Sequence, residues 1–468
     1  MSKTILTSVS TLALIAAVPA FAQNNTSTVT QSGTAQTAAV GQSGSSNAST
    51  VTQSGAYNSG TVDQSGSNAT STILQSSTAS SAANGGQASV TQTGNGASSL
   101  VTQSGTNLNA AQVTQDGASE SEITQNVGRN EAEVVQGGGD GNSSVINQNG
   151  IGNGVGDALN GAANTGVSQF GNDNLSNVNQ DPSNNARATV AQTGDGNDSD
   201  IQQTLAVTGG DNTTAAVSQT GTGNVSSVAQ SARENDAVVA QTGDGNLSAV
   251  TQTGAGANAT VTQNGTANDS SVDQADSATA DVTQSGQQNL SQVDQSAGAA
   301  GAGATVEQAG GTNESQISQS ATSVAFVEQI GDNNYSTIAQ SASGTQANVS
   351  QLGDDGTSDV TQTGADNQAN VNQLAGSSLA NSLILQSGTG NTATVTQGGA
   401  GNDSDVLQAA NDSQADVTQL GNSNISLVDQ ASGSGHSATV TQNSNSNIST
   451  VTQNGTGNSA VVTQGGGI

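Results

Sequence analysis

A sequence motif of eleven residues recurs along the chain and limits the folds that the chain can adopt. It is clearest from Gln241 to Gln274, where Gln241 and Gln263 are each followed at the same offsets by Gly, Asn, Ser, Val and the next Gln. Over the whole chain, 38 glutamines hold this position, and each has Val or Ile two residues before it. Few apolar residues and much Gly would suggest disorder, but disorder does not keep apolar residues in register. The pattern therefore indicates an ordered repeat protein.

The even spacing of the repeated residues predicts short β-strands, because every second residue of a strand lies on the same face. The glycine after each Gln marks a bend, since Gly tolerates positive φ. One strand cannot bury its own inner face, so successive units must stack on each other. We therefore expect an all-β fold, a parallel β-solenoid. Its predicted inward ladder comprises Asn246, Ser248, Val250, Gln252, Asn268, Ser270, Val272 and Gln274.

A second period of 22 residues shows that two units make one turn, or rung, of the solenoid. Between Gln274 and Gln351 the residue two positions after each Gln is alternately Gly and another residue, so the two bends of a rung differ. Two strands per rung give about 19–20 rungs. Parallel stacking places Gln over Gln and Asn over Asn about 4.8 Å apart, and side-chain amides at that spacing form hydrogen-bonded ladders.

Three places break the eleven-residue spacing. We interpret the extra residues between Gln75 and Gln92 and between Gln203 and Gln219 as surface loops. Between Gln148 and Gln169 we expect one degenerate unit, with Asn153 in register, Asp157 at the Val position and Leu159 at the Gln position. None of these is a domain boundary, so residues 23–468 are expected to form one repetitive domain.

The first 22 residues resemble a secretory signal peptide. Lys3 supplies the positive start, an apolar run extends from Ile5 to Val18, and Ala20-Phe21-Ala22 has the form of a cleavage site. No later stretch is long and apolar enough for a membrane helix. We therefore expect a secreted mature chain without a transmembrane helix.

Charge and composition exclude several classes of partner and chemistry. The formal net charge of -31 argues against nucleic acid and anionic membranes, which attract basic surfaces. The absence of Cys excludes disulfides and thiolate sites. His436 is the only histidine, so it cannot form a histidine cluster or a triad. Because no nucleophile, base and orienting group recur together, we predict no enzyme, no catalytic residues and no cofactor.

The carboxylates do not suggest a metal site either. Asp273 and Asp294 lie at odd offsets from the repeat Gln and should face solvent, with calcium binding as the weaker interpretation. The segment from Gly243 to Asn246 reads Gly-Asp-Gly-Asn, but it lacks the tandem register of calcium-binding nonapeptides. We interpret it as a turn and predict no metal.

The spacing Q-x-G-x-x-N-x-[AS]-x-x-x-Q resembles the curlin repeat of bacterial curli fibre subunits. It stands here as Gln241, Gly243, Asn246, Ser248 and Gln252, and again from Gln230 through Asn235 and Ala237 to Gln241. The resemblance implies an extracellular functional-amyloid subunit that self-associates into fibres for biofilm matrix, adhesion and aggregation. It also implies a curli-type outer-membrane secretion system and a nucleating minor subunit. The chain has many more repeats than a typical curli major subunit.

Two other functions remain open at the level of sequence. Outward T-x-T triplets, such as Thr260-Val261-Thr262 and Thr439-Val440-Thr441, resemble those of β-helical ice-binding proteins. A non-polymerising cell-surface adhesin is the other alternative. Concentration-dependent filaments would favour the fibre function, and a soluble monomer with thermal hysteresis would favour ice binding.

Overall fold

The computed structural model describes residues 24–81, 85–106, 108–155, 166–181, 185–204 and 212–465. The predicted signal peptide, residues 1–22, lies outside the described residues. All regular elements in the described ranges are β-strands. The chain divides into two compact units, Met1–Glu234 and Asn235–Ile468, called unit 1 and unit 2 here.

The strands are short and follow one another along both units. Those of unit 1 are β1 (Thr26–Thr34), β2 (Thr37–Gln42), β3 (Ala48–Ala56), β4 (Ser59–Gln64), β5 (Thr70–Gln75), β6 (Gln87–Gln92), β7 (Ser98–Gln103), β8 (Ala110–Gln115), β9 (Glu120–Gly128), β10 (Glu131–Gly137), β11 (Ser143–Ile151), β12 (Gly154–Val155), β13 (Val167–Phe170), β14 (Leu175–Gln180), β15 (Arg187–Asp195), β16 (Asp198–Gln203), β17 (Thr214–Thr222) and β18 (Val225–Gln230).

Unit 2 continues the same series. Its strands are β19 (Asp236–Asp244), β20 (Leu247–Gln252), β21 (Asn258–Thr266), β22 (Asp269–Gln274), β23 (Thr279–Gln287), β24 (Leu290–Gln295), β25 (Gly303–Gly311), β26 (Glu314–Gln319), β27 (Val324–Ile330), β28 (Tyr335–Gln340), β29 (Gln346–Gln351), β30 (Thr357–Gln362), β31 (Gln368–Gln373), β32 (Asn381–Gln386), β33 (Thr392–Gln397), β34 (Asp403–Gln408), β35 (Gln414–Gln419), β36 (Ile425–Ser434), β37 (Ser437–Gln442), β38 (Ile448–Thr456) and β39 (Ser459–Gln464).

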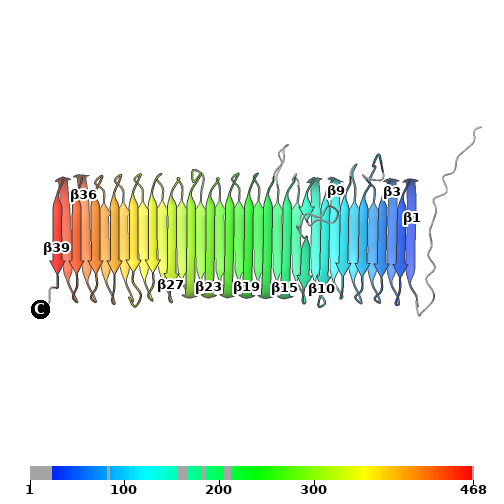
Figure 1. Cartoon of the computed structure of the whole chain (residues 1–468), viewed down its shortest axis with the longest axis horizontal. Helices are drawn as coiled ribbons and strands as arrows, with labels where there is room; N and C mark the ends of the chain where they lie inside the picture. The colour runs from blue at the N-terminus through cyan, green and yellow to red at the C-terminus, as the bar shows by residue number, and fades with distance from the viewer. Residues whose placement is uncertain are drawn as a thin grey trace, which may run out of the picture. The chain divides into compact units, whose positions relative to one another are not determined.

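Nearly every strand pairs in parallel with the second strand after it, so each unit contains two parallel sheets. In unit 2 the even-numbered strands form one sheet, called sheet A, and the odd-numbered strands form sheet B, as the stacked arrows from β19 to β39 show (Figure 1). In unit 1, sheet A holds β1, β3, β5, β7, β9, β11, β14, β16 and β18. The register aligns Val250 with Val272 and Gln252 with Gln274. The predicted parallel β-solenoid is confirmed, with about 19 rungs and two strands per rung.

The interior is a set of aligned columns, one residue type per column. Burial alternates along the strands, and Val250, Val272 and the repeat glutamines are almost completely buried. The small inward residue is Ser in sheet A, as in Ser248 and Ser270, and Ala in sheet B of unit 2, as in Ala259. The two sheets can therefore approach closely. The Ser248 and Ser270 hydroxyls are buried without a hydrogen-bond partner in the described structure.

The two bends of a rung differ, as the 22-residue period predicted. In unit 2 a column of glycines with φ near +110° follows the first strands of sheet B, including Gly243 (φ 110°) and Gly286 (φ 106°). A Cβ on Gly243 would lie 2.0 Å from the Gly265 carbonyl oxygen of the next rung, so only glycine fits there. Two residues later, Gly245 (φ 65°) begins a left-handed column that Ala267 and Gln288 also occupy.

The degenerate unit expected between Gln148 and Gln169 is not a separate half-rung with a strand of its own. Gly154 of β12 pairs with Glu131, and Gln169 of β13 pairs with Gln136 on the same neighbouring strand, β10. β12 and β13 are therefore two parts of one strand, separated by an insertion. Asp157 and Leu159, the residues predicted to complete the unit, lie outside the described residues. An insertion preserves the alternation between the sheets, whereas an extra half-rung would have reversed it.

Candidate assembly site

The glutamine columns form continuous hydrogen-bonded ladders. In sheet A of unit 2, the Gln252 side chain donates to Gln274 Oε1 (2.9 Å), and Gln274 donates to Gln295 (2.9 Å). The same contact continues rung by rung to Gln453. Sheet B has a second ladder, beginning with Gln241 and ending at Gln464. Unit 1 repeats the arrangement, as in the donation from Gln53 to Gln75 (2.8 Å).

Most of the repeat glutamines also join the two sheets. The Gln252 amide reaches across the core to the backbone oxygen of Asp236 on β19 (2.9 Å), and Gln263 reaches Leu247 on β20 (2.8 Å). A primary amide has two N–H donors, and these two contacts use both. A residue without an amide would leave a buried carbonyl unpaired, at a cost of about 1–3 kcal/mol.

The asparagine column has a different partner, the glycine turn. Asn246 Nδ2 donates to the Gly265 carbonyl of the next rung (3.0 Å). This is the same oxygen that would lie 2.0 Å from a Cβ on Gly243. Asn246 Oδ1 accepts the backbone N–H of Asn268 (3.1 Å). The G-x-x-N spacing of the repeat thus has a physical reason, because glycine admits the carbonyl and asparagine binds it.

The backbone fixes the direction of both amide columns. Gln274 must turn its nitrogen toward the Asn258 carbonyl, so its Oε1 faces Gln252 of the preceding rung. Asn246 must turn its oxygen toward the Asn268 N–H, so its Oδ1 faces the following rung. The Gln and Asn amides consequently point in opposite directions along the stack, and the two ends of a ladder present different groups.

The described rungs at the two ends of the chain are open edges. β1 and β2 pair only with β3 and β4 among the described strands, and Val29 and Gln31, which face inward, are only half-buried. At the other end, β38 and β39 pair only with β36 and β37 among the described strands, and the inward Val462 and Gln464 are only half-buried. β1 and β38 have the same sequence except at Thr26/Ile448 and Ser32/Asn454.

The structure brings the eight predicted ladder residues together in two adjacent rungs. All eight are at most 1% exposed, and β20 and β22 align Ser248 with Ser270 as they align the Val and Gln residues. Between Asn246 and Asn334 the asparagine column of unit 2 stands only before the sheet A strands, and the corresponding position before the sheet B strands holds Ala257, Ala278, Ala302 and Ser323. Further along unit 2, Asn367 and Asn391 stand before sheet B strands. A Gly three residues before each of these asparagines was the signal that the sequence offered.

His436 takes the place of an asparagine in this pattern. It is 2% exposed, its Nε2 lies 2.9 Å from the Ser432 carbonyl, and its Nδ1 lies 3.4 Å from the Asn458 backbone N–H. Both contacts form when Nε2 carries the proton and Nδ1 accepts. With this proton arrangement His436 donates to a carbonyl of its own turn and accepts a backbone N–H of the next rung, as the Asn246 side chain does.

Most carboxylates lie on the outer faces, and some stand opposite each other. Asp273 faces Asp294 on neighbouring strands, and Glu307 faces Glu328. Burial raises the pKa of Asp269, and burial together with Asp403 raises the pKa of Asp405. Within the described ranges, no three His, Cys, Asp or Glu side chains lie close enough together to hold a metal ion.

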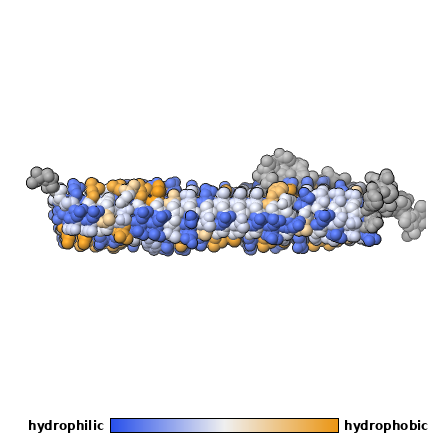
Figure 2. Space-filling view, turned by 90° about the horizontal axis from the view of Figure 1, so that it is seen from below, coloured by the Kyte–Doolittle hydropathy of each residue, from blue (hydrophilic) through white to orange (hydrophobic). Residues whose placement is uncertain are grey.

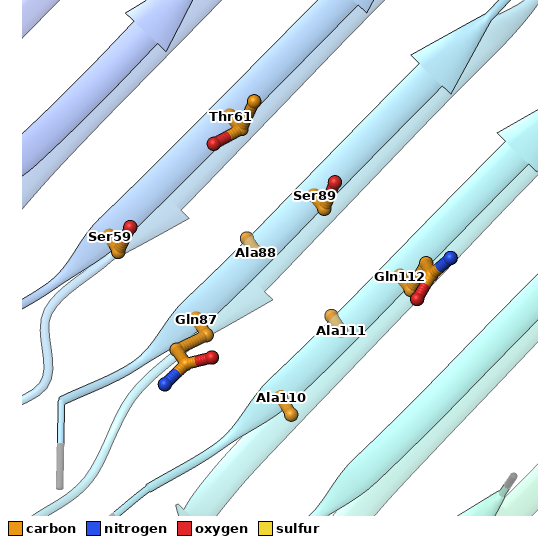
Figure 3. A pocket seen from close by; sticks show the side chains of 8 residues that line it. All are labelled: Ser59, Thr61, Gln87, Ala88, Ser89, Ala110, Ala111 and Gln112. Carbon is orange, nitrogen blue, oxygen red and sulfur yellow. The ribbon is translucent and has the colours of Figure 1, made fainter. Parts of the chain in front are cut away.

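The outer faces offer little for chemistry. A shallow hollow on sheet B of unit 1 is lined by Ser, Thr, Ala and Gln side chains of β4, β6 and β8, including Thr61 and Gln112 (Figure 3). It contains no titratable group, so its hydroxyls have no base to activate them. The T-x-T residues also do not form a continuous row, since Asp281 lies beside Thr260 and Asp416 lies between Thr394 and Thr439.

Comparison with protein families identifies the type of repeat in four stretches of the chain. A model described as the curlin associated repeat matches residues 22–55, 210–243, 233–265 and 410–443. The chain carries curlin-associated repeats. Each matched stretch contains three repeat glutamines, and the same Gln and Val or Ile positions recur in the described rungs between the matches. Curlin repeats on a β-solenoid fit a structural subunit of the curli type. None of the curated proteins compared with the chain matches it. No helix in the described residues is long and apolar enough to cross a membrane.

Proposed function

We propose that this protein is the structural subunit of extracellular, amyloid-like fibres that contribute to biofilm matrix, adhesion and aggregation. In this proposal residues 1–22 direct secretion, and the mature chain, residues 23–468, is exported by a curli-type outer-membrane system. A nucleating minor subunit starts fibre growth. Export and nucleation rest on the curlin repeats.

The observation that carries the proposal is the pair of open ends with matching strands. Unpaired strand edges are templates for further pairing, and amide ladders of fixed direction determine which ends can join. In both ladders the Nε2 group of each Gln donates to the Oε1 of the Gln one rung later in the chain. Gln453 and Gln464, at the C-terminal end, therefore present N–H donors to an added rung, and Gln31 and Gln42, at the N-terminal end, present Oε1 acceptors. β38 and β39 of one chain therefore continue onto β1 and β2 of the next, with donors facing acceptors. Two like ends would place donor against donor or acceptor against acceptor.

A pair of adjacent lysine substitutions tests this joining surface. In Val29→Lys the ammonium points inward but can reach solvent past the open end, so the monomer should fold. Joining another chain would bury that charge, so we expect fibre elongation to fall by at least about tenfold. In the control, Thr28→Lys, the same charge points outward from the same strand and should leave elongation nearly unchanged. Thioflavin fluorescence and electron microscopy of seeded growth measure both.

The outcomes separate the possibilities. Equal elongation of the two variants would show that the β1 edge is not the joining surface. A wild-type protein that remains monomeric at high concentration, without fibres or the 4.8 Å reflection of stacked strands, would contradict the proposed function itself.

Fibre growth should accelerate as the pH falls from 7 toward 4. The raised pKa values of Asp269 and Asp405 mean that the folded state binds protons more tightly than the unfolded chain does. Folded-state stability therefore increases as the pH falls through the raised pKa values toward the ordinary value of 3.8. A lower pH also reduces the net negative charge of the chain, and with it the like-charge repulsion between chains that come together.

We expect an elongation rate at least about threefold higher at pH 4 than at pH 7. Asp405→Asn should reduce this dependence, and high salt at pH 7 should reproduce part of the acceleration by screening. A rate that stays constant or falls on acidification would contradict the electrostatic explanation.

A further inference from the structure

The carboxylates of unit 2 are distributed unevenly over its two outer faces. On sheet B, the outward side chains of β29, β31, β33, β35 and β37, together with the residue after each Gln, include one charged group, Asp416. The rest are Gln, Asn, Ser, Thr, Leu and one Gly. We call this surface the neutral face. The Gln414 amide donates to the Asp416 carboxylate (2.8 Å), so even this charge has a local partner.

Sheet A and the rest of sheet B differ from the neutral face. In the same part of unit 2, sheet A presents Asp359, Asp403, Asp405 and Asp429. The earlier strands of sheet B carry further carboxylates, among them the facing pair Glu307 and Glu328. For a chain with a net charge of -31, the neutral face is thus a region where a second copy can approach with little like-charge repulsion.

A continuous apolar stripe follows one margin of the neutral face. It consists of the residue directly after the Gln in successive sheet B strands: Ile330, Leu352, Leu374, Gly398 and Leu420. Ile330, Leu374 and Leu420 are 46%, 38% and 50% exposed. A Cβ on Gly398 would lie 3.4 Å from Leu374 Cδ1 and 3.5 Å from Leu420 Cδ2, so the two leucines close over the glycine. Hydrophobic residues gather along the margins of this C-terminal part of unit 2, at the left of Figure 2.

We propose that the neutral face is a lateral contact between fibres, and that its occupant is the same face of a second copy of this chain. This inference rests on the proposed function. The face has an area of roughly 500 Å², from five strands about 4.8 Å apart and about seven residues long, below the roughly 800 Å² per partner of stable complexes. Single chains therefore stay separate. In a fibre the face recurs with every subunit, so many weak contacts act together and fibres pair.

Two leucines with equal exposure provide a matched test. Leu374 lies in the apolar stripe, and Leu385 lies on β32 of sheet A, and both are 38% exposed. Leu374→Asp and Leu385→Asp add the same charge at two consecutive strands of the chain, the first on the outer face of sheet B and the second on the outer face of sheet A. Electron microscopy gives the number of filaments per bundle, and seeded thioflavin assays give elongation separately.

We expect wild-type and Leu385→Asp fibres to pair, and Leu374→Asp fibres to elongate normally but remain mostly single. Pairing of Leu374→Asp fibres at the wild-type level, or equal loss of pairing in both variants, would overturn the lateral contact while leaving the fibre function intact. Wild-type fibres that stay single until a neutral polysaccharide is added would also overturn it, because the face would then bind glycan. If the wild-type protein forms no fibres, the proposed function fails and this inference fails with it.

Discussion

Replacing Gln351 with Glu should open the solenoid locally and stop fibre growth, although the two side chains have nearly the same shape. Gln351 accepts from Gln329 (2.8 Å) and donates to Gln373 Oε1 (3.0 Å) and to the Tyr335 carbonyl (3.1 Å). A glutamate would place an oxygen against those two acceptor oxygens in a fully buried site. We expect a loss of about 3 kcal/mol or more in the free energy of local opening.

The control is in the same strand. Gln346 begins β29 and points outward, so Gln346→Glu introduces the same group on an exposed position and should cost less than about 0.5 kcal/mol. Hydrogen exchange of the β27–β31 amides reports the free energy of local opening. Burial should raise the pKa of the carboxyl group introduced by Gln351→Glu, so lowering the pH should partly restore the stability of that variant. Similar protection in the two variants at pH 7 would show that the inward amides are not what holds the rungs together.

Substitution of Gly243 by alanine should be nearly as damaging. The new Cβ would lie 2.0 Å from the Gly265 carbonyl oxygen, so the next rung would have to move. That movement would also lengthen the hydrogen bond from Asn246 Nδ2 to the same oxygen. The clash is with backbone and not with a flexible side chain, so we expect a cost of about 3 kcal/mol or more.

Gly245 provides the comparison two residues away in the same turn. It also has positive φ (65°), but no atom of the described residues lies within 4 Å of the place that a Cβ would take, and Ala267 occupies the equivalent position one rung later. Gly245→Ala should therefore cost only about 1 kcal/mol. Hydrogen exchange of the β19 and β21 amides distinguishes the two variants. Equal costs would mean that positive φ alone, and not the approach of the next rung, accounts for glycine at position 243.

The strand positions and the rung length were predictable from the sequence because they depend on periodicity. Val250 and Gln252 recur at even offsets, which leaves only one strand face for them. The identity of each strand's sheet was also readable, since inward Ser248 and Ser270 mark sheet A and Ala259 marks sheet B. A repeat pattern that treats Ser and Ala as equivalent small residues hides this distinction.

Other features depend on three-dimensional positions that no local pattern gives. In unit 1, the positive-φ glycine turn follows sheet A at Gly33 and Gly55, but it follows sheet B at Gly171 and Gly194. The insertion between β12 and β13 leaves Asn153 in its column and so resembled an extra repeat. The direction of the Gln amides follows from backbone carbonyls across the core, such as that of Asp236, whose positions appear only after folding.

The opposed Gln and Asn amides have a consequence for the electric moment of a long assembly. Aligned dipoles in a column add up, so a stack built from one amide series alone would accumulate an electric moment with every rung. Here the Gln carbonyls of both sheets point back along the axis and that of Asn246 points forward, so the asparagine opposes part of the glutamine moment in its turn. The electric moment of a filament should then grow more slowly with its length than two glutamine columns alone would make it grow, and its two tips still differ in electrostatic potential.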